Sequence, residues 1–366
     1  MCIFSNLLIY SNILKKEVKN MAKTVRLIDI GKKLGVSAVT VSKALSGQKG
    51  VSEEMREKIV RLADEMGYKR SDSQIESSKE KSFTIGVIVA DRYLGENQSF
   101  YWKLYQEISK WAISRNCFPM LEVISHEVEK RSELPKVILE KKADGLIVMG
   151  EFKHGYAEFL AENIPVPTVN LDTTGRGKVT DCVVSNNLMG GYEMTNYLFE
   201  MGHSKIGFVG TRLSTTSIDD RFFGYLKSMM EHGMTVHEGW ILDDRDRETG
   251  FVDVENKFEL PEEMPTAFFC NCDGTASLLI RKLAQNGYSV PEDVSVIGFD
   301  NYIPDQFGGV GITTYEINTK EMAKRTVHII LHKLRNDNYS TGIFMLPGKF
   351  VERDSVRRIA PAVPFV

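Results

Sequence analysis

The sequence predicts a small all-α domain followed by an α/β body of two doubly wound parallel-sheet lobes with a ligand cleft between them. Two observations predict this order. Residues 25–68 carry three short apolar patterns at helical spacing, whereas the chain from Phe83 onward alternates short apolar runs with longer amphipathic ones. Alternating strands and helices build parallel sheets that helices cover on both faces. The body spans about 280 residues, more than one core usually holds, so we expect two lobes.

Three helices are expected in the first domain, over residues 27–34, 37–45 and 53–66. Gly35 ends the first helix and Gly67 ends the third, because glycine readily adopts the left-handed conformation that follows a helix. Ser37 and Ser52 stand where a hydroxyl caps the second and third helices. The three apolar faces then form one small core.

The body is expected to contain at least eight strands and five long helices. The strands are Thr84–Ala90, Met120–Ile124, Gly145–Met149, Thr168–Leu171, Cys182–Ser185, Lys205–Val209, Ala267–Cys270 and Val294–Phe299. The helices are Tyr101–Ser114, Leu188–Met201, Ile218–His232, Gly274–Asn286 and Asn318–Leu334. Clefts at the carboxyl ends of such strands bind small ligands.

The domain boundaries follow from two weakly apolar stretches. We expect a leader over residues 1–20, a headpiece over 21–70, a linker over 71–82 and a body over 83–366. The leader's apolar run, Phe4–Leu14, is shorter than the ~20 residues that span a bilayer, and its positive charges follow the run. The leader is therefore either a disordered arm or a start-site artefact, and no membrane partner is expected. From Arg70 to Ser82 the only apolar residue is Ile75.

The charge of the chain is unevenly divided. Residues 21–81 hold 13 basic and 9 acidic side chains, whereas residues 82–366 hold 30 and 39. A basic head on an acidic body indicates a polyanion partner for the head, although mildly basic domains without such a partner are also common. The five cysteines, an odd number among apolar neighbours, favour a reducing cytoplasm and exclude a disulfide framework.

The first two helices and the Gly35-Val36-Ser37 turn match a DNA-binding helix-turn-helix. The second helix offers small, hydroxyl and cationic side chains to a groove ~12 Å wide. The candidate DNA contacts are Thr24, Arg26, Ser37, Ala38, Val39, Thr40, Ser42, Lys43 and Lys49. The alternative is a three-helix bundle with no nucleic-acid partner.

Motifs for catalysis, cofactors and metals are missing from the sequence. It contains no G-x-G-x-x-G after a strand, no phosphate-binding G-x-x-x-x-G-K-[ST] and no G-x-S-x-G nucleophile elbow. His328 and His332 stand four residues apart but lack a third ligand, and the Cys270 and Cys272 pair lacks a second pair. We therefore expect neither an enzyme, nor a cofactor, nor a metal site.

A family resemblance rests on the headpiece and on six body motifs. The headpiece reads VRLIDIGKKLGVSAVTVSKALSGQKGVSEEMREKIVRLADEMGY, and the body motifs are FTIGVIVAD, KADGLIVMG, MGHSKIGFVG, DRFFGYLKSMMEHG, PEDVSVIGFDN and LPGKFVERDSV. In this order they resemble the lactose-repressor/galactose-repressor (LacI/GalR) family of bacterial transcriptional regulators, over residues 25 to about 355. The resemblance implies a helix-turn-helix headpiece and a periplasmic-binding-protein-like body.

The resemblance also implies roles for individual residues. Lys43 approaches a guanine edge, with Ala38 and Val39 at the other base-facing positions. The effector-contacting residues it implies are Phe100, Tyr101, Arg221, Asp273 and Asp300. Two departures are evident, since Cys272 replaces an asparagine and Arg245 stands where several members have an aromatic side chain. Arg221 also has a simpler interpretation, pairing with Asp219 or Asp220 on a solvated face.

The linker departs from the family as well. Members form a short hinge helix whose leucine wedges into the minor groove, whereas ungapped counting places Ser77 at that position. We therefore expect a largely flexible linker and less operator bending than is usual in the family.

These observations predict a cytoplasmic, nucleoid-associated transcriptional regulator, most simply a repressor. It binds a near-palindromic operator as a dimer, with a tetramer as an open alternative, and holds a small-molecule effector, a sugar or sugar derivative, in the interlobe cleft. Two rivals share the body fold. One is a transport-type solute-binding protein, which needs export, and the other is an enzyme that uses the cleft.

Overall fold

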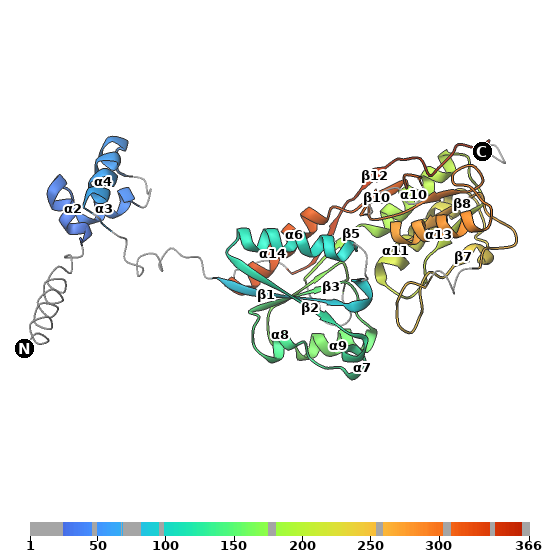
Figure 1. The fold of residues 1–366 in the computed structure, drawn as a ribbon, viewed down its shortest axis with the longest axis horizontal. Coiled ribbons are helices and arrows are strands. Elements are labelled where there is room, and N and C mark those ends of the chain that lie inside the picture. The colour runs from blue at the N-terminus through green and yellow to red at the C-terminus, as the bar shows by residue number, and fades with distance from the viewer. Residues whose placement is uncertain are drawn as a thin grey trace, which may run out of the picture. The chain divides into compact units, whose positions relative to one another are not determined.

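The computed structural model describes residues 25–45, 50–66, 68, 82–94, 99–174, 181–253, 259–302, 309–336 and 341–360. The chain divides into two compact units, the headpiece within residues 1–80 and the body within residues 81–366 (Figure 1). The expectations for the leader, Thr24, Lys49 and linker residues 71–81 lie outside the described residues. Among the helices described, none is both long enough and apolar enough to cross a membrane.

The headpiece contains the three expected helices, α2 (Leu27–Leu34), α3 (Ala38–Leu45) and α4 (Glu53–Glu65). Their inward faces form a core of Ile30, Val41, Ala44, Ile59 and Ala63. Ser37 caps α3 as expected, since its Oγ accepts from the Thr40 amide at 3.1 Å. Ser52 occupies the cap position of α4 without a side-chain capping hydrogen bond, so that part of the prediction was wrong.

The first lobe of the body, the N-lobe, is built on a six-stranded sheet in the order β11-β5-β4-β3-β1-β2. All neighbouring strands in this sheet are parallel. The strands are β1 (Phe83–Ala90), β2 (Cys117–Ile124), β3 (Gly145–Met149), β4 (Thr168–Leu171), β5 (Asp181–Ser185) and β11 (Ile343–Leu346). Its helices are α6 (Phe100–Ser114), α7 (His126–Arg131), α8 (Lys136–Leu139), α9 (His154–Asn163) and α14 (Thr319–Arg335).

The second lobe, the C-lobe, is built on a four-stranded parallel sheet in the order β7-β6-β8-β9. Its strands are β6 (Ile206–Val209), β7 (Ile241–Leu242), β8 (Ala267–Cys270) and β9 (Ser295–Ile297). An antiparallel pair, β10 (Thr314–Glu316) and β12 (Lys349–Val351), lies beside it. The helices are α10 (Asn187–Glu200), α11 (Thr216–Glu231) and α13 (Asp273–Gln285).

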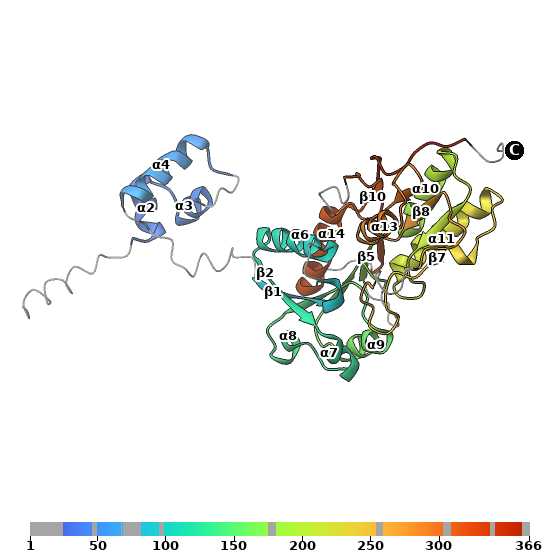
Figure 2. The same cartoon turned by 45° about the vertical axis from the view of Figure 1, so that its right-hand side comes forward.

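Each sheet is covered on both faces, which confirms the doubly wound prediction. Along β1, Ile85 and Val87 share a core with α6, while Ile88 and Ala90 share another with α8 and α9. Figures 1 and 2 both show α6 and α14 side by side over one face of the N-lobe sheet. In the C-lobe, Phe208 and Phe269 face the core shared with α11, whereas Val209 and Phe268 face α13.

The chain crosses between the lobes after β5, after β10 and after β11. All eight expected strands and all five long helices are present, with boundaries shifted by at most three residues. The sequence analysis missed β7, β10, β11 and β12 and the helices α7, α8 and α9. These elements are short, and β11 alternates exposed and half-buried residues, so none stands out as an apolar run.

Candidate functional site

The turn between α2 and α3 is tight because two glycines permit it. Gly35 adopts a left-handed conformation, with φ of 67°, directly after α2. A Cβ at Gly31 would stand 2.6 Å from the Val36 carbonyl oxygen, so a larger residue there would push the turn outward. These two positions fix the angle at which α3 leaves α2.

The outward face of α3 carries the candidate base contacts. Val41 and Ala44 are buried in the headpiece core, whereas Val39 is 64% exposed and Lys43 is exposed. Ala38 and Ser42, partly exposed, stand one residue before them on the same face. The outward face therefore offers one cation, one hydroxyl and two small apolar groups.

Two further candidates have intramolecular roles. The Ser37 hydroxyl lies 2.9 Å from that of Thr40 in addition to capping the helix. Exposed Arg26 precedes α2, where its amide donates to the Asp29 carboxylate at 2.9 Å. At the other end of α3, Arg56 of α4 donates to the Ala44 carbonyl at 2.7 Å, which anchors the helix to the rest of the headpiece.

In the N-lobe, Tyr101 and Asp172 meet at the edge where β4 ends. The Ser99 hydroxyl caps α6 and so sets Tyr101 in its first turn. The Tyr101 hydroxyl donates to Oδ2 of Asp172 at 2.7 Å, and Oδ1 of this buried carboxylate has no hydrogen-bond partner among the described residues. Burial raises the pKa of Asp172 to about 6, and burial next to this carboxylate raises the pKa of Tyr101 well above its ordinary value.

In the C-lobe, Arg221 and Asp300 form a buried ion pair. Arg221 follows the Thr215 cap of α11, and Asp300 follows β9 with a φ of 95°. Nη2 of Arg221 lies 3.0 Å from Oδ1 of Asp300, so the two groups form an ion pair. Their relative orientation does not meet the geometry of a hydrogen bond. The simpler interpretation of Arg221, a pair with Asp219 or Asp220 on a solvated face, is not what the structure contains. Burial raises the pKa of Asp300 despite the guanidinium beside it.

Arg221 has further partners that hold its guanidinium in place. Its Nε donates to Asn187 at 2.9 Å and its Nη1 donates to the Asn271 carbonyl at 2.5 Å. The Phe299 ring lies 4.0 Å from the guanidinium carbon. Each nitrogen of this guanidinium thus has a partner within the C-lobe.

The other two predicted effector residues, Asp273 and Phe100, are both buried. Oδ1 of Asp273 accepts from the Thr314 hydroxyl at 2.7 Å, and burial raises the pKa of Asp273 to about 8. Phe100 is only 7% exposed and packs into the N-lobe core, edge-on to Tyr101. Cys272 caps α13 with its sulfur, a position where a hydroxyl or amide oxygen is usual.

Arg245 is buried, in a compact charged network that the sequence analysis did not foresee. Its guanidinium donates to both oxygens of Asp244, at 2.9 and 2.7 Å, and lies 3.2 Å from Oδ1 of Asn271. These bonds hold the pKa of Asp244 below its ordinary value although burial opposes this. The Arg245 guanidinium is therefore already hydrogen-bonded within the protein and does not offer an open surface on which a ligand could stack.

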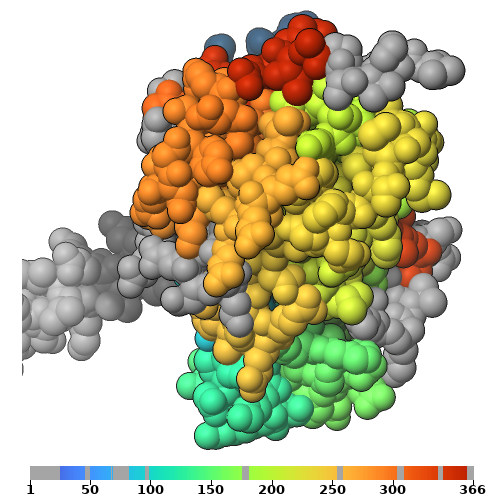
Figure 3. Space-filling view, turned by 90° about the vertical axis from the view of Figure 1, so that its right-hand side faces the viewer, coloured from blue at the N-terminus to red at the C-terminus, as the bar shows by residue number. Residues whose placement is uncertain are grey.

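The two lobes contact each other through side chains around this region. The Glu151 carboxylate, after β3, accepts from the backbone amide and hydroxyl of Thr216 in the C-lobe, at 2.6 and 2.7 Å. Lys153 donates to the carbonyl oxygens of Arg247, at 3.3 Å, and of Glu248. Figure 3 shows the yellow-to-gold chain around residue 250 reaching down to the cyan and green N-lobe surface.

The charges of this interlobe site favour one kind of ligand. Asp172, Asp273 and Asp300 are buried carboxylates, whereas the guanidinium groups of Arg221 and Arg245 are already bonded to protein oxygens. A ligand that donates hydrogen bonds would satisfy Oδ1 of Asp172, since a buried acceptor without a partner is unfavourable. No cluster of three or more metal-ligating side chains occurs among the residues that the structure describes.

Sequence reasoning missed Asp172, Glu151 and Tyr93. Tyr93 lies against Tyr101, with ring centroids 4.6 Å apart, and donates to the Glu151 carbonyl at 2.8 Å. A signal was present for two of them, because Glu151 and Asp172 closely follow predicted strands, where parallel sheets place ligand-binding residues.

The chain matches two protein-family profiles. Residues 26–71 match the family described as bacterial regulatory proteins, lacI family, and residues 195–356 match the periplasmic binding protein-like domain. The HTH-type transcriptional repressor PurR of Vibrio campbellii (strain ATCC BAA-1116) is 26% identical over 333 residues, which cover 90% of this chain and 98% of that protein.

Two solved structures share the fold. The transcriptional regulator CelR in its cellobiose complex has a TM-score of 0.63 at 20% identity, over 90% of this chain and 99% of that one. The Lac repressor dimer bound to operator and the anti-inducer ONPF has a TM-score of 0.61 at 20% identity, over 92% of this chain and all of that one (100%).

Proposed function

The chain belongs to the lacI family of bacterial regulatory proteins, and on that premise we propose that it is a repressor that binds its operator as a homodimer and responds to a hydroxyl-rich effector held between its lobes. As a member of this family it is a DNA-binding transcriptional regulator and not an enzyme. A cytoplasmic location is part of the proposal, because the operator lies there.

The operator contact is supported by the face of α3. Lys43 extends from a helix whose other side is fixed in the headpiece core, so it reaches outward from a rigid support. A lysine can donate to guanine O6 or N7, and Val39 can contact a thymine methyl group. Two such helices, one from each protomer, would read successive major grooves about one DNA turn apart.

The effector is proposed to be neutral and rich in hydroxyl groups, as a sugar is. The observation that carries this is Oδ1 of Asp172, a buried acceptor without a partner in the described part of the chain, close to the charged Arg221 and Asp300 pair. Among the described residues, an anionic ligand would meet these carboxylates, and the guanidinium groups of Arg221 and Arg245 already have protein partners. The cellobiose bound by the CelR structure is a ligand of this class.

The homodimer is supported by an apolar edge on the body. Strand β2 is the outermost strand of the N-lobe sheet, and Phe118, Met120 and Val123 on it are 65%, 39% and 49% exposed. An exposed apolar strand edge is a usual place for association with another chain. The Lac repressor structure is that of a dimer on operator DNA.

A titration of operator DNA in rising salt, followed by fluorescence anisotropy, tests the DNA function. With four phosphate contacts per headpiece, the logarithm of the affinity should fall with the logarithm of salt with a slope of about −7. A slope near zero on every sequence would exclude the regulator. In a parallel arm, a neutral sugar panel should change operator affinity in the wild type and not in Asp172→Asn.

A further inference from the structure

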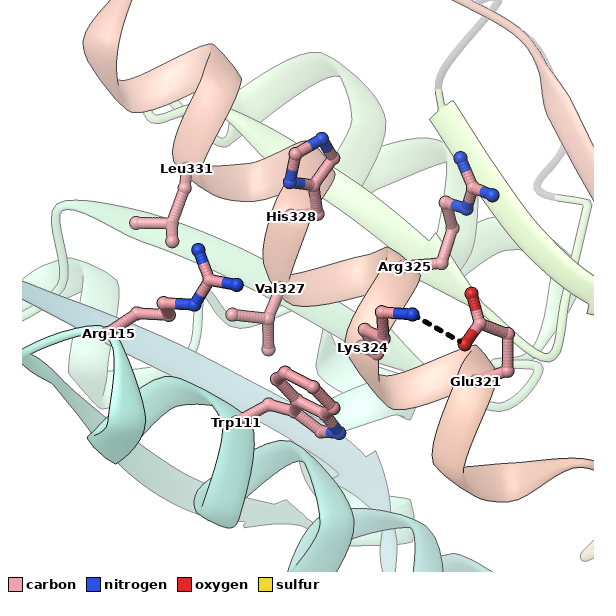
Figure 4. Close-up of a pocket in the computed structure, with 8 residues that line it drawn as sticks. All are labelled: Trp111, Arg115, Glu321, Lys324, Arg325, Val327, His328 and Leu331. Carbon is pink, nitrogen blue, oxygen red and sulfur yellow. Dashed lines mark hydrogen bonds and ion pairs between the residues drawn. The ribbon is translucent and has the colours of Figure 1, made fainter.

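A pocket lies between α6 and α14, near the end of α6 that is away from Tyr101. It has a volume of about 280 Å³, near the lower end of the range for small-molecule sites. Its lining residues are Trp111, Arg115, Glu321, Lys324, Arg325, Val327, His328 and Leu331 (Figure 4). None of them belongs to the candidate effector site.

The lining of this pocket is strongly cationic. Arg115, Lys324 and Arg325 contribute three positive charges, against one carboxylate, Glu321. Glu321 already forms an ion pair with Lys324, 3.0 Å long. Within the described part of the chain, neither Arg115 nor Arg325 forms an ion pair with a carboxylate.

The pocket also has an apolar floor. Val327 and Leu331 are buried beneath it, and the Trp111 indole lies along one side (Figure 4). The Lys324 ammonium lies 5.8 Å from the centre of that ring. A ligand with one anionic end and a compact apolar or planar body would match both parts of the surface.

His328 is an exposed side chain with several cations nearby. Its Nε2 lies 2.9 Å from Nε2 of His332, and burial, His332, Arg325, Arg115 and Arg335 all lower its pKa. The facing imidazole nitrogens alone would suit a metal ion, but the surrounding guanidinium groups repel one. An anion is favoured by the same charges.

We propose that this pocket binds a phosphate group carried by a small metabolite. Arg115 supplies a planar guanidinium donor, which matches phosphate oxygens better than an ammonium does, and Lys324 and His328 supply further donors. The Arg325 guanidinium, 5.4 Å from the Phe344 ring and directed away from Arg115, adds positive charge to the surroundings (Figure 4). The organic part of the metabolite lies against Trp111. The inference rests on this pocket alone and is independent of the proposed effector and operator.

The test uses the full chain and two probes, inorganic phosphate and phenyl phosphate, at constant ionic strength to hold screening fixed. The readouts are the His328 side-chain resonance and the Trp111 indole resonance, assigned with His328→Gln and Trp111→Phe. Both probes should shift both resonances and raise the pKa of His328. Phenyl phosphate should bind at least threefold more tightly, because its ring contacts Trp111.

Charge variants give the decisive comparison. Arg115→Gln should weaken binding of phenyl phosphate at least tenfold, and Glu321→Gln should strengthen it. The matched control is Lys320→Gln, which removes an exposed positive charge from the same helix outside the pocket and should change affinity less than twofold. Equal losses in Arg115→Gln and Lys320→Gln, equal affinity for the two probes, or binding of Zn²⁺ in preference to both, would overturn the proposal.

Discussion

Arg221 and Asp300 lie 3.0 Å apart and form an ion pair in which both side chains are less than a tenth exposed. The resemblance assigned each of them separately to the effector, and the structure makes each the other's partner. A ligand that contacts one therefore also perturbs the other. The ion pair therefore contributes to the stability of the fold, and an experiment has to distinguish this contribution from its proposed role in effector binding.

Breaking this pair should destabilise the body strongly, whereas replacing both partners should destabilise it less. Asp300→Asn leaves Arg221 buried beside a neutral group and should lower the free energy of unfolding by about 3–5 kcal/mol in urea titrations. The double variant Arg221→Met with Asp300→Asn should recover part of that loss, because asparagine tolerates the φ of 95° at this position, and it should still fail to respond to effector. Operator affinity should remain within twofold in both.

The exposed ion pair between Arg247 and Asp243, 2.9 Å long, is the matched control for this experiment. Asp243→Asn should change stability by less than about 1 kcal/mol. If Asp300→Asn lowers the free energy of unfolding equally little, the buried ion pair does not make the electrostatic contribution to stability that we expect.

Asp172 should make stability depend on pH in a direction unusual for an aspartate. Its folded-state pKa of about 6 lies above the ordinary 3.8, so the folded state holds the proton more tightly and stability falls as pH rises from about 4 to about 6. Asp172→Asn should remove this fall and raise stability at pH 7 by up to about 3 kcal/mol. Exposed Asp354→Asn is the control and should leave the pH profile unchanged. A wild type whose stability rises over this interval would contradict the raised pKa.

Strong local patterns were readable from the sequence. Gly145–Met149 and Ala267–Cys270 are uninterrupted apolar runs in parallel sheets, and they were predicted with the boundaries that the structure has. The edge strand β11 and the antiparallel pair β10 and β12 are defined by distant partners, so their short segments carry no comparable signal.

The site was predicted less completely than the fold. Arg221 and Asp300 followed from the resemblance, but their pairing depends on how α11 and β9 approach each other. The placement of Asp172 against Tyr101 depends on the packing of the N-lobe, and the contact between Arg245 and Asn271 depends on the packing of the C-lobe. Such contacts join residues far apart in the chain, which local spacing does not encode.

Lys43 should contribute sequence discrimination as well as charge. Lys43→Ala should weaken operator binding by about 1–3 kcal/mol and relax the preference at one symmetric base position. Lys58→Ala is the control, because Lys58 lies on α4 and pairs with Glu54 at 2.7 Å. Anisotropy titrations against operators substituted at single positions measure both effects. An equal weakening on all sequences would make Lys43 a phosphate contact only.

The contact between Glu151 and Thr216 should stabilise the closed arrangement of the lobes. Glu151 belongs to the N-lobe and accepts two hydrogen bonds from Thr216 at the start of α11, five residues before Arg221. Thr216→Val removes the hydroxyl donor and keeps the amide, so a charge-assisted hydrogen bond typically worth about 1.5–3 kcal/mol is lost from the closed form alone.

A loss of that size shifts the population toward an open form and lowers apparent effector affinity, by about tenfold where closure is only marginally favoured. Ser217→Ala is the matched control, because the Ser217 hydroxyl contacts Thr215 within the same lobe. Small-angle scattering measures closure and calorimetry measures affinity. Since the headpiece is untouched, affinity for operator in the absence of effector reports whether closure itself changes DNA binding. A Thr216→Val variant that scatters and binds effector as the wild type does would show that other contacts, such as Lys153 with Glu248, hold the lobes together.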